Sequence, residues 1–379
     1  MDAAANRAWT LAGLAIAGVA GIAALILLPQ IVELATLLDI TVYFIMAILA
    51  LSLGLVWGYG GILCFGQAAF FGLGAYTYAI VMFNMGESTV PALAGIALPA
   101  AFAALLGYFM FYGRISDVYL GVITLTVTLI LFNAINSTAG PEYHIGSAML
   151  GGFNGVPAIP PLNMPFDASA ALDLNDMFYL SMGLLLLTYF GLRWLLVSHF
   201  GRVMVAISQN ERRAEFLGYD ARAYKLATFT IGGAIAGMAG VLFANWGAFV
   251  SPTIFGLAQS AQIIIWVIVG GRGTLIGPIV GCIGIQWLTA WLGTVQLGGK
   301  SMGAWIDKAL GGGEFGHVVG SIAGTIDLSN SNLVLGAVLL AFVLLVPKGI
   351  VPSIADLFRA WLPLRRAPMA PQLETEKLP

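Results

Sequence analysis

The chain has 379 residues, of which 59% are hydrophobic and only 9% are charged, and its mean hydropathy is +0.93. No soluble fold of this length hides so much apolar surface, so the composition indicates a protein whose solvent is the lipid bilayer. The formal net charge is −2, and no basic stripe of the kind that binds nucleic acid is present. Cys64 and Cys282 both lie in apolar runs, which favours buried thiols over a disulfide.

Ten apolar runs reach, or nearly reach, the length that crosses a bilayer. They are 8–28, 40–57, 66–83, 91–112, 118–138, 177–197, 226–247, 258–270, 275–293 and 331–347. The run 258–270 is short for a crossing, so it and the next run are candidates for a broken or re-entrant pair. We therefore predict an all-α fold, a polytopic transmembrane helical bundle with about ten spans.

Lysine and arginine indicate which ends of these runs face the cytoplasm. If Arg7 is placed inside and the chain crosses ten times, the other basic residues also fall inside, except for Lys300 and Lys308. The outer loop 139–176 then contains no lysine or arginine, as the positive-inside rule requires. We therefore expect both the N-terminus and the C-terminus to be cytoplasmic.

The chain divides into a first helix with its outer loop (1–39), a main transmembrane domain (40–352) and a cytoplasmic tail (353–379). Proline and glycine in the outer loop 139–176 predict an irregular segment that is ordered by packing. Apolar residues at near-helical spacing in 294–330 predict a short helix that lies on the outer surface. The proline-rich end of the tail is expected to be disordered.

The segment 198–225 is the one mixed-charge, helix-prone stretch between the apolar runs. Asn210 is suited to cap a helix at 210–217 whose first turn carries Glu211, and Gly218 is suited to end it. Such a helix is either part of a solvated loop or a coupling helix that inserts into a groove of a cytoplasmic motor protein. The length of the segment favours the coupling helix. Its candidate docking residues are Asn210, Glu211, Arg212, Arg213, Ala214, Glu215, Phe216, Leu217 and Gly218.

Two apolar stretches are interrupted by glycine, one at 57–76 and the other at 269–278. Paired interruptions in the two halves of a transporter point to a translocation pathway lined by broken helices. Small residues also serve close helix packing, and the glycines around Arg272 also suit a tight cytoplasmic turn. The candidate break positions are Gly66, Gly72, Gly74, Gly271 and Gly273.

A small set of side chains within the spans is a candidate for the lining of a solute pathway. Asparagine and glutamine also bond one membrane helix to another, so both interpretations stand. The candidate pathway residues are Gln67, Phe70, Asn133, Gln259, Gln262 and Trp266. No ionisable side chain lies near the centre of a span, which argues against a proton-driven or cation-driven mechanism.

The sequence contains no arrangement of residues typical of an enzyme. His144, His199 and His317 are scattered without metal-ligand spacing, and no nucleophile is paired with a base. A run at 293–301 is similar to a phosphate-binding loop, but it has one residue too many before Lys300 and follows an apolar span rather than a strand. We therefore expect no catalytic residue, no metal site and no cofactor in this chain.

Three runs, 66–76, 209–220 and 265–278, together resemble the permease subunits of ABC importers for branched-chain amino acids. The resemblance extends over residues 40–352, and the related urea and short-chain amide permeases share much of the pattern. It implies an inward transporter of the bacterial inner membrane for a small polar solute. An amino acid is the first expectation, urea or a short-chain amide is the alternative, and an ATP-independent channel or facilitator is the more distant alternative.

The resemblance also implies partners. A homologous second permease would complete a heterodimeric core, two cytoplasmic ATPase subunits would bind ATP and Mg²⁺, and a periplasmic solute-binding protein would deliver the solute. The helix at 210–218 matches the ATPase-coupling helix of such permeases. The general pattern there is Glu-Ala-Ala followed by Gly, whereas here only Ala214 and Gly218 fit, with Arg212 and Arg213 in the first two places. The place of docking is therefore carried over and the individual contacts are not.

Overall fold

The computed structural model describes residues 29–296 except 141, 165 and 166, together with 349–353 and residues 18, 21, 25 and 27. The expectations for the runs 8–28 and 331–347, for the outer segment 294–330 and for the tail 353–379 lie wholly or almost wholly outside the described residues.

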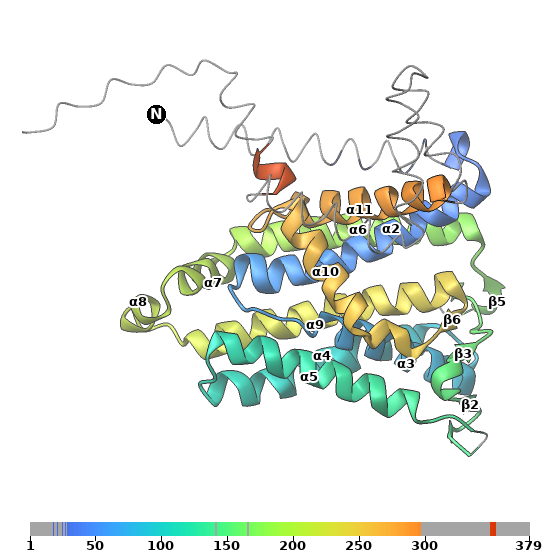
Figure 1. The fold of residues 1–379 in the computed structure, drawn as a ribbon, viewed down its shortest axis with the longest axis horizontal. Coiled ribbons are helices and arrows are strands. Elements are labelled where there is room, and N and C mark those ends of the chain that lie inside the picture. Colours follow the sequence, from blue (N-terminus) through green and yellow to red (C-terminus); the bar gives the residue numbers. More distant parts are fainter. Residues whose placement is uncertain are drawn as a thin grey trace, which may run out of the picture.

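A bundle of long apolar helices makes up most of the described chain (Figure 1). Among the described residues, six helical segments are long and apolar enough to cross a membrane, and α10 and α11 are shorter apolar helices. This confirms a polytopic membrane bundle. The helices are α2 (Leu34–Leu53, continued by a π-helical turn at Gly54–Tyr59), α3 (Gln67–Met85), α4 (Thr89–Tyr112), α5 (Asp117–Asn136), α6 (Leu174–Val197), α9 (Ala221–Gly247), α10 (Leu257–Gly270) and α11 (Ile276–Gln296).

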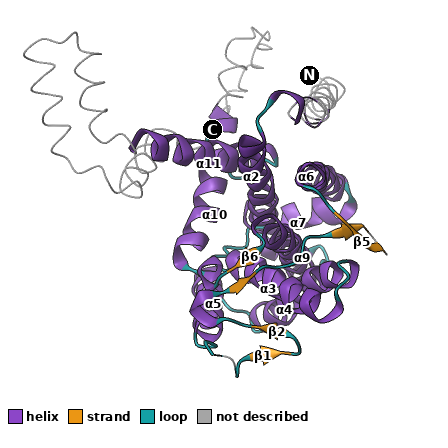
Figure 2. Cartoon of the chain, turned by 90° about the vertical axis from the view of Figure 1, so that its right-hand side faces the viewer, coloured by secondary structure: helices purple, strands orange, loops and turns teal. Residues whose placement is uncertain are grey.

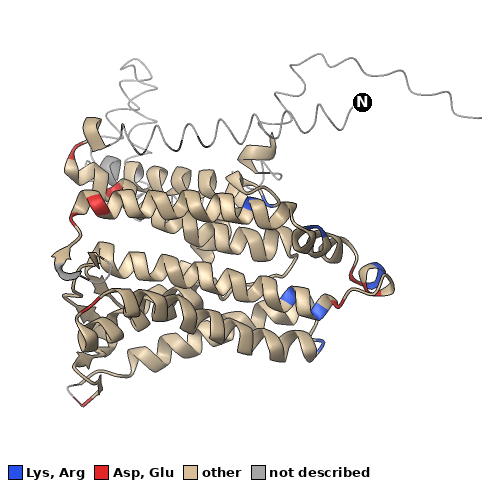
Figure 3. Ribbon diagram, turned by 180° about the vertical axis from the view of Figure 1, so that it is seen from behind, with Lys and Arg blue, Asp and Glu red and all other residues tan. Residues whose placement is uncertain are grey.

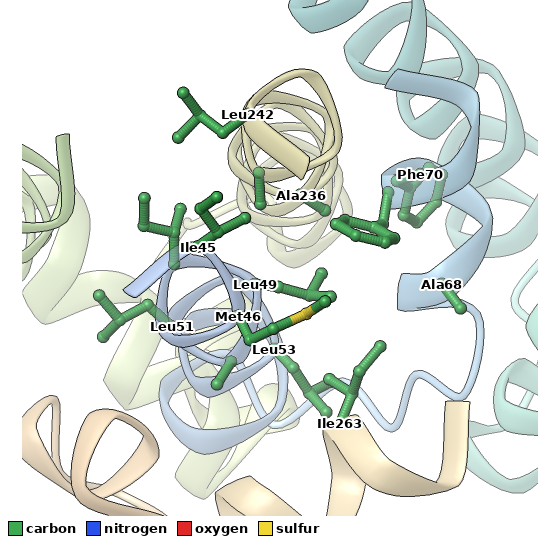
Figure 4. Packing of buried hydrophobic residues seen from close by; sticks show 14 of the residues in the cluster. Ile45, Met46, Leu49, Leu51, Leu53, Ala68, Phe70, Ala236, Leu242 and Ile263 are labelled. Atoms are coloured by element: carbon green, nitrogen blue, oxygen red, sulfur yellow. The ribbon is translucent and has the colours of Figure 1, made fainter. Parts of the chain in front are cut away.

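The bundle is built around α2, α3 and α9. Figure 2 looks along the helices and shows α9 at the centre, with α3 and α4 beside it and with α10 and α11 against α2. Apolar side chains of α2, α3, α9 and α10 interlock there, as Figure 4 shows for Ile45, Leu49, Phe70, Ala236 and Ile263. Most of the α2 surface is buried, whereas α4 and α5 leave most of their apolar surface exposed, as suits helices that meet lipid or another chain.

Glycine allows α3 and α9 to pack backbone against backbone. A Cβ atom on Gly240 would fall well inside van der Waals distance of the Phe71 carbonyl oxygen, and one on Gly74 would collide with the backbone of Gly237. Small residues at such positions let membrane helices approach closely. Within the bilayer, dispersion forces between the packed helices then stabilise the contact in place of the hydrophobic effect.

The outer loop differs from the irregular segment that its prolines predict. It contains three short antiparallel strand pairs, and one of them joins the loop to the chain after α9 through Val156 and Val250. Gly146 adopts a φ of 63° in a tight turn, a conformation that glycine reaches easily because it has no Cβ atom. The strands are β1 (His144–Ile145), β2 (Ala148–Met149), β3 (Val156–Pro157), β4 (Asn163–Met164), β5 (Asp167–Ala171) and β6 (Phe249–Val250).

Charge is distributed unevenly between the two ends of the bundle. Figure 3 shows lysine and arginine in the half that carries α7 (His199–Gln209) and α8 (Glu211–Phe216), while most acidic residues lie toward the strands. The strand-bearing end carries Glu33, Glu87, Glu142, Asp173 and Asp176. Under the positive-inside rule this asymmetry favours the α8 end as the cytoplasmic one.

Candidate functional site

A short helix, α8, projects at the basic end of the bundle between α7 and α9 (Figure 1). The Asn210 side chain accepts a hydrogen bond from the Arg213 amide at 3.0 Å and so caps the first turn. The chain leaves the helix at Gly218, whose φ of 89° is accessible to glycine without strain. The observed helix Glu211–Phe216 therefore lies within the 210–217 range expected from the sequence, with the expected residues at both ends.

The side of α8 that faces the protein is attached to α7 and α9. Ala214 is buried in a small apolar cluster with Val203, Ile207 and Ala221, which is separate from the main core. Glu211 and Lys225 form an ion pair of 2.6 Å, which joins the start of α8 to the first turns of α9. These contacts join α8 to the start of α9.

The opposite side of α8 ends in two exposed apolar side chains. Phe216 is 89% exposed and Leu217 is 77% exposed, and the turn at Gly218 follows them directly. Isolated apolar residues on a surface are common, but two adjacent ones at a projecting tip form an apolar patch suited to a partner pocket. We call Phe216 and Leu217 the apolar tip.

Two hollows flank α8. The first, of about 380 Å³, lies between α8, the α4–α5 turn and the start of α9; its charged side chains are Arg114, Glu211, Arg212, Glu215, Arg222 and Lys225. The second, of about 490 Å³, lies on the α7 side and is lined by His199, Arg202, Gln209, Arg213 and Tyr219, among others. The helix therefore stands as a ridge between a mainly polar depression and a mainly apolar one, a shape that a partner can contact from both sides.

The two glycine-rich interruptions meet in space. After the π-helical turn, residues 60–66 leave helical geometry before α3 begins at Gln67. The Arg272 guanidinium lies 4.8 Å from the centre of the Trp57 ring, a favourable cation–π contact. A Cβ on Gly58 would come within 3.3 Å of the Gly273 amide nitrogen, so the two backbones are nearly in contact.

Gln67 joins this region to the core. Its side chain is 2% exposed, and its Nε2 donates to Ser52 Oγ at 2.8 Å and to the Gly232 carbonyl at 3.2 Å. The Cys64 thiol donates to Gln67 Oε1 at 3.6 Å. Because both amide hydrogens are used, Gln67 holds α2, the start of α3 and α9 together in this conformation.

The six candidate pathway residues do not converge on one cavity. The Phe70 ring packs edge-on against the Phe229 ring, with 5.3 Å between their centres, and Trp266 is buried on the side of α10 that faces the core. Asn133 lies on the exposed side of α5 and donates to the Leu129 carbonyl at 3.0 Å, whereas Gln259 and Gln262 are half-buried on α10. In the described part of the chain, no group of three or more His, Cys, Asp or Glu side chains lies together as a metal site would require.

A family model described as "Branched-chain amino acid transport system / permease component" matches residues 35–344. The match covers well over half of the chain and extends from the second residue of α2 through α11. The chain belongs to this permease family. No solved structure matches it.

Two curated relatives are similar to this permease at 30% identity, and both are named "High-affinity branched-chain amino acid transport system permease protein LivM". The match to the Escherichia coli (strain K12) protein extends over 279 residues, 67% of this chain and 63% of the relative. The match to the Salmonella typhimurium protein extends over 267 residues, 64% of this chain and 60% of the relative. The permease therefore covers less than two thirds of the length of either relative.

Two of the glycines expected at helix breaks in this permease do not break a helix. Gly72 and Gly74 lie inside the uninterrupted α3, where Gly72 admits the Phe255 ring and Gly74 admits the α9 backbone. The sequence could not distinguish a glycine that breaks a helix from one that allows close helix packing, because both roles depend on the absence of a Cβ atom. Gly66 precedes α3, and Gly271 and Gly273 adopt positive φ between α10 and α11, so these three do lie at helix ends.

Sequence reasoning missed three residues of this permease. Lys225 is the partner of Glu211 across fourteen positions, and helical periodicity within α9 alone does not reveal such a contact. Tyr76 and Ser260 carry buried polar atoms without a hydrogen-bond partner in the structure. The one sequence signal that could have pointed to Ser260 is its position directly after Gln259, a candidate pathway residue.

Proposed function

We propose that this chain is the membrane-spanning permease subunit of a binding-protein-dependent ABC importer that moves a branched-chain or other small amino acid inward. Membership of the permease family and the names of the two relatives support the amino acid over urea or a short-chain amide. Residues 40–352 form the transporting domain in this proposal, and both termini lie in the cytoplasm of a bacterium.

The observation that carries the proposal is the geometry of α8. It is a capped helix at the basic end of the bundle, fixed to α9 on one side and carrying the exposed Phe216 and Leu217 on the other. A cytoplasmic ATPase subunit docks on this ridge, the apolar tip enters a pocket of the ATPase, and the flanking charges set the orientation. A second permease presents the matching helix to a second ATPase, and a periplasmic solute-binding protein meets the strand-bearing end.

The permease transmits force and does not hydrolyse ATP. ATP and Mg²⁺ bind in the partner subunits, and closure of the two ATPases draws the coupling helices together. The Glu211–Lys225 pair and the Ala214 cluster pass the displacement of α8 to α9. Helix α9 packs tightly on α3 and holds Gln67 through the Gly232 carbonyl, so the start of α3 moves with it. The region of Trp57 and Arg272, where the two interruptions meet, then opens or closes the inner end of the path.

The test is uptake by vesicles that contain this permease with its ATPases, second permease and binding protein. We expect uptake of a branched-chain amino acid to require ATP on the side of the membrane where the ATPases are bound. We also expect uptake to stop when Glu211, Arg212 and Arg213 are all replaced by alanine. Equal uptake without any ATPase would establish the channel alternative instead. Full assembly and uptake by the triple variant would show that the docking surface lies elsewhere.

A further inference from the structure

Two helices that pack against each other, α3 and α10, carry three buried polar atoms with no hydrogen-bond partner. These atoms are Tyr76 Oη on α3 and Gln259 Nε2 and Ser260 Oγ in the first turn of α10. Tyr76 and Ser260 are each only 3% exposed. An unpaired polar group in a membrane protein is costly, so a concentration of three such groups requires an explanation.

Tyr76 contacts the segment of the chain that leads into α10. The Tyr76 ring lies on the Phe255 ring, with 5.7 Å between their centres, and Phe255 ends the short helix that directly precedes α10. Gly72, one turn earlier on α3, leaves room for the same Phe255 ring. Helices α3, α5 and α10 also contact one another. The Tyr76 side chain is therefore held beside Phe255, the first residue of the segment 255–260, which we call the α10 start.

The α10 start also offers free backbone donors. Its cap residue, Gly256, has no side chain, and the first helical bond runs from the Ser260 amide to the Gly256 carbonyl. The amides of the preceding first-turn residues therefore have no partner within the helix. Helices α2, α3, α4 and α5 likewise begin without a side-chain cap, whereas α8 and α9 are capped by the side chains of Asn210 and Asp220. A free helix start carries partial positive charge and favours an anion.

The chemistry of these groups is that of hydrogen-bond donors. The Gln259 Nε2 atom and the backbone amides only donate, and the Tyr76 and Ser260 hydroxyls each have a hydrogen to donate. A carboxylate offers about four acceptor sites and no donor, which suits this set of donors, whereas urea or a primary amide offers the two lone pairs of one carbonyl oxygen and brings N–H donors of its own. No charged side chain is needed, which suits a solute that must leave again.

We propose that Tyr76, Gln259 and Ser260, with the free amides of the α10 start, form a site for the carboxylate of the transported amino acid. The proposal rests on the proposed function, and it places a solute contact on the side of α10 that faces α3. The groups then have a partner only while the solute passes, and they destabilise the protein when the site is empty. Such sites lower the stability of the empty protein, so their removal should stabilise it.

The experiment uses two conservative variants of the full chain, Tyr76→Phe and Ser260→Ala, each of which removes one hydroxyl. We expect the melting temperature of the empty permease to stay equal or rise, because an unpaired buried polar atom is gone. We expect kcat/KM for uptake by the complete transporter to fall about tenfold to a hundredfold, the usual effect of removing a donor to a charged group. Ser181→Ala is the matched control: its hydroxyl is buried on α6 but already donates to the Met177 carbonyl at 2.6 Å, so uptake should not change.

A second measurement separates the site from the proposed function. Leucine should raise the melting temperature of the purified permease, while leucinamide, which lacks the carboxylate, should not, and both variants should lose the response to leucine. Normal uptake together with an unchanged leucine response in both variants would overturn the site and leave the proposed function intact. A leucine response that the variants lose, in a transporter without ATP-driven uptake, would support the site and refute the proposed function. A fall in the melting temperature of both empty variants would show that the hydroxyls have structural partners and would overturn the site.

Discussion

Replacing Phe216 with aspartate should abolish ATP-driven uptake and leave the permease folded. The side chain is 89% exposed, so the substitution removes almost no packing within the chain. If the apolar tip fills a pocket of the ATPase, a carboxylate there would be buried without a partner. Loss of such an anchor costs about 2–4 kcal/mol of binding free energy, which weakens ATPase binding roughly 30-fold to 1,000-fold.

The measurement is the dissociation constant between the purified permease complex and its ATPase, read together with uptake. Phe216→Leu is the control, because it keeps an apolar tip and should retain most of the affinity. The melting temperature should be the same for both variants. If Phe216→Asp binds the ATPase as tightly as the unchanged chain does, the apolar tip is not the anchor.

Replacing Gly240 with alanine should strongly destabilise the bundle. The new Cβ would meet the Phe71 carbonyl oxygen and the Ala75 amide, and backbone atoms within packed helices cannot move aside as a flexible side chain can. Overpacking of this kind costs about 1–3 kcal/mol and sometimes more. The melting temperature in detergent should fall by several degrees, and the yield of folded protein should fall with it.

Gly183→Ala is the matched control for Gly240→Ala, since a Cβ at Gly183 on α6 meets nothing within 4 Å. The same chemical change should there be neutral or stabilising, because alanine favours the helix by about 0.5–1 kcal/mol over glycine. Equal effects at both positions would show that α3 and α9 are not in backbone contact.

The helices of this permease follow from hydropathy, but their ends do not. Sequence reasoning starts the second and seventh runs at residues 40 and 226, whereas α2 starts at Leu34 and α9 at Ala221. Asp39 and Lys225 lower the local hydropathy, yet helical hydrogen bonding continues through them. Hydropathy reports where the chain meets lipid, and a helix ends only where a cap or a turn residue stops it.

Helix α8 was accessible from sequence because its signals are local. Asn210 and Gly218 act on neighbours within a few residues, so their spacing alone locates α8. The groups that depend on tertiary structure were not accessible. The pairing of Glu211 with Lys225, the bonds of Gln67 to Ser52 and the lack of partners around Tyr76 all depend on how separate helices meet. The short strands of the outer loop were hidden by the prolines beside them.

The most direct test of the proposed function determines on which side of the membrane α8 lies. Phe216→Cys places an exposed thiol at the apolar tip, and the native Cys64 and Cys282 are buried, so they should give little background. Glu142→Cys, exposed in the outer loop, serves as the opposite marker. With a membrane-impermeant maleimide, we expect Phe216→Cys to react in inverted vesicles and Glu142→Cys in right-side-out vesicles. Labelling of Phe216→Cys in right-side-out vesicles would contradict the account, because no cytoplasmic ATPase could then reach α8.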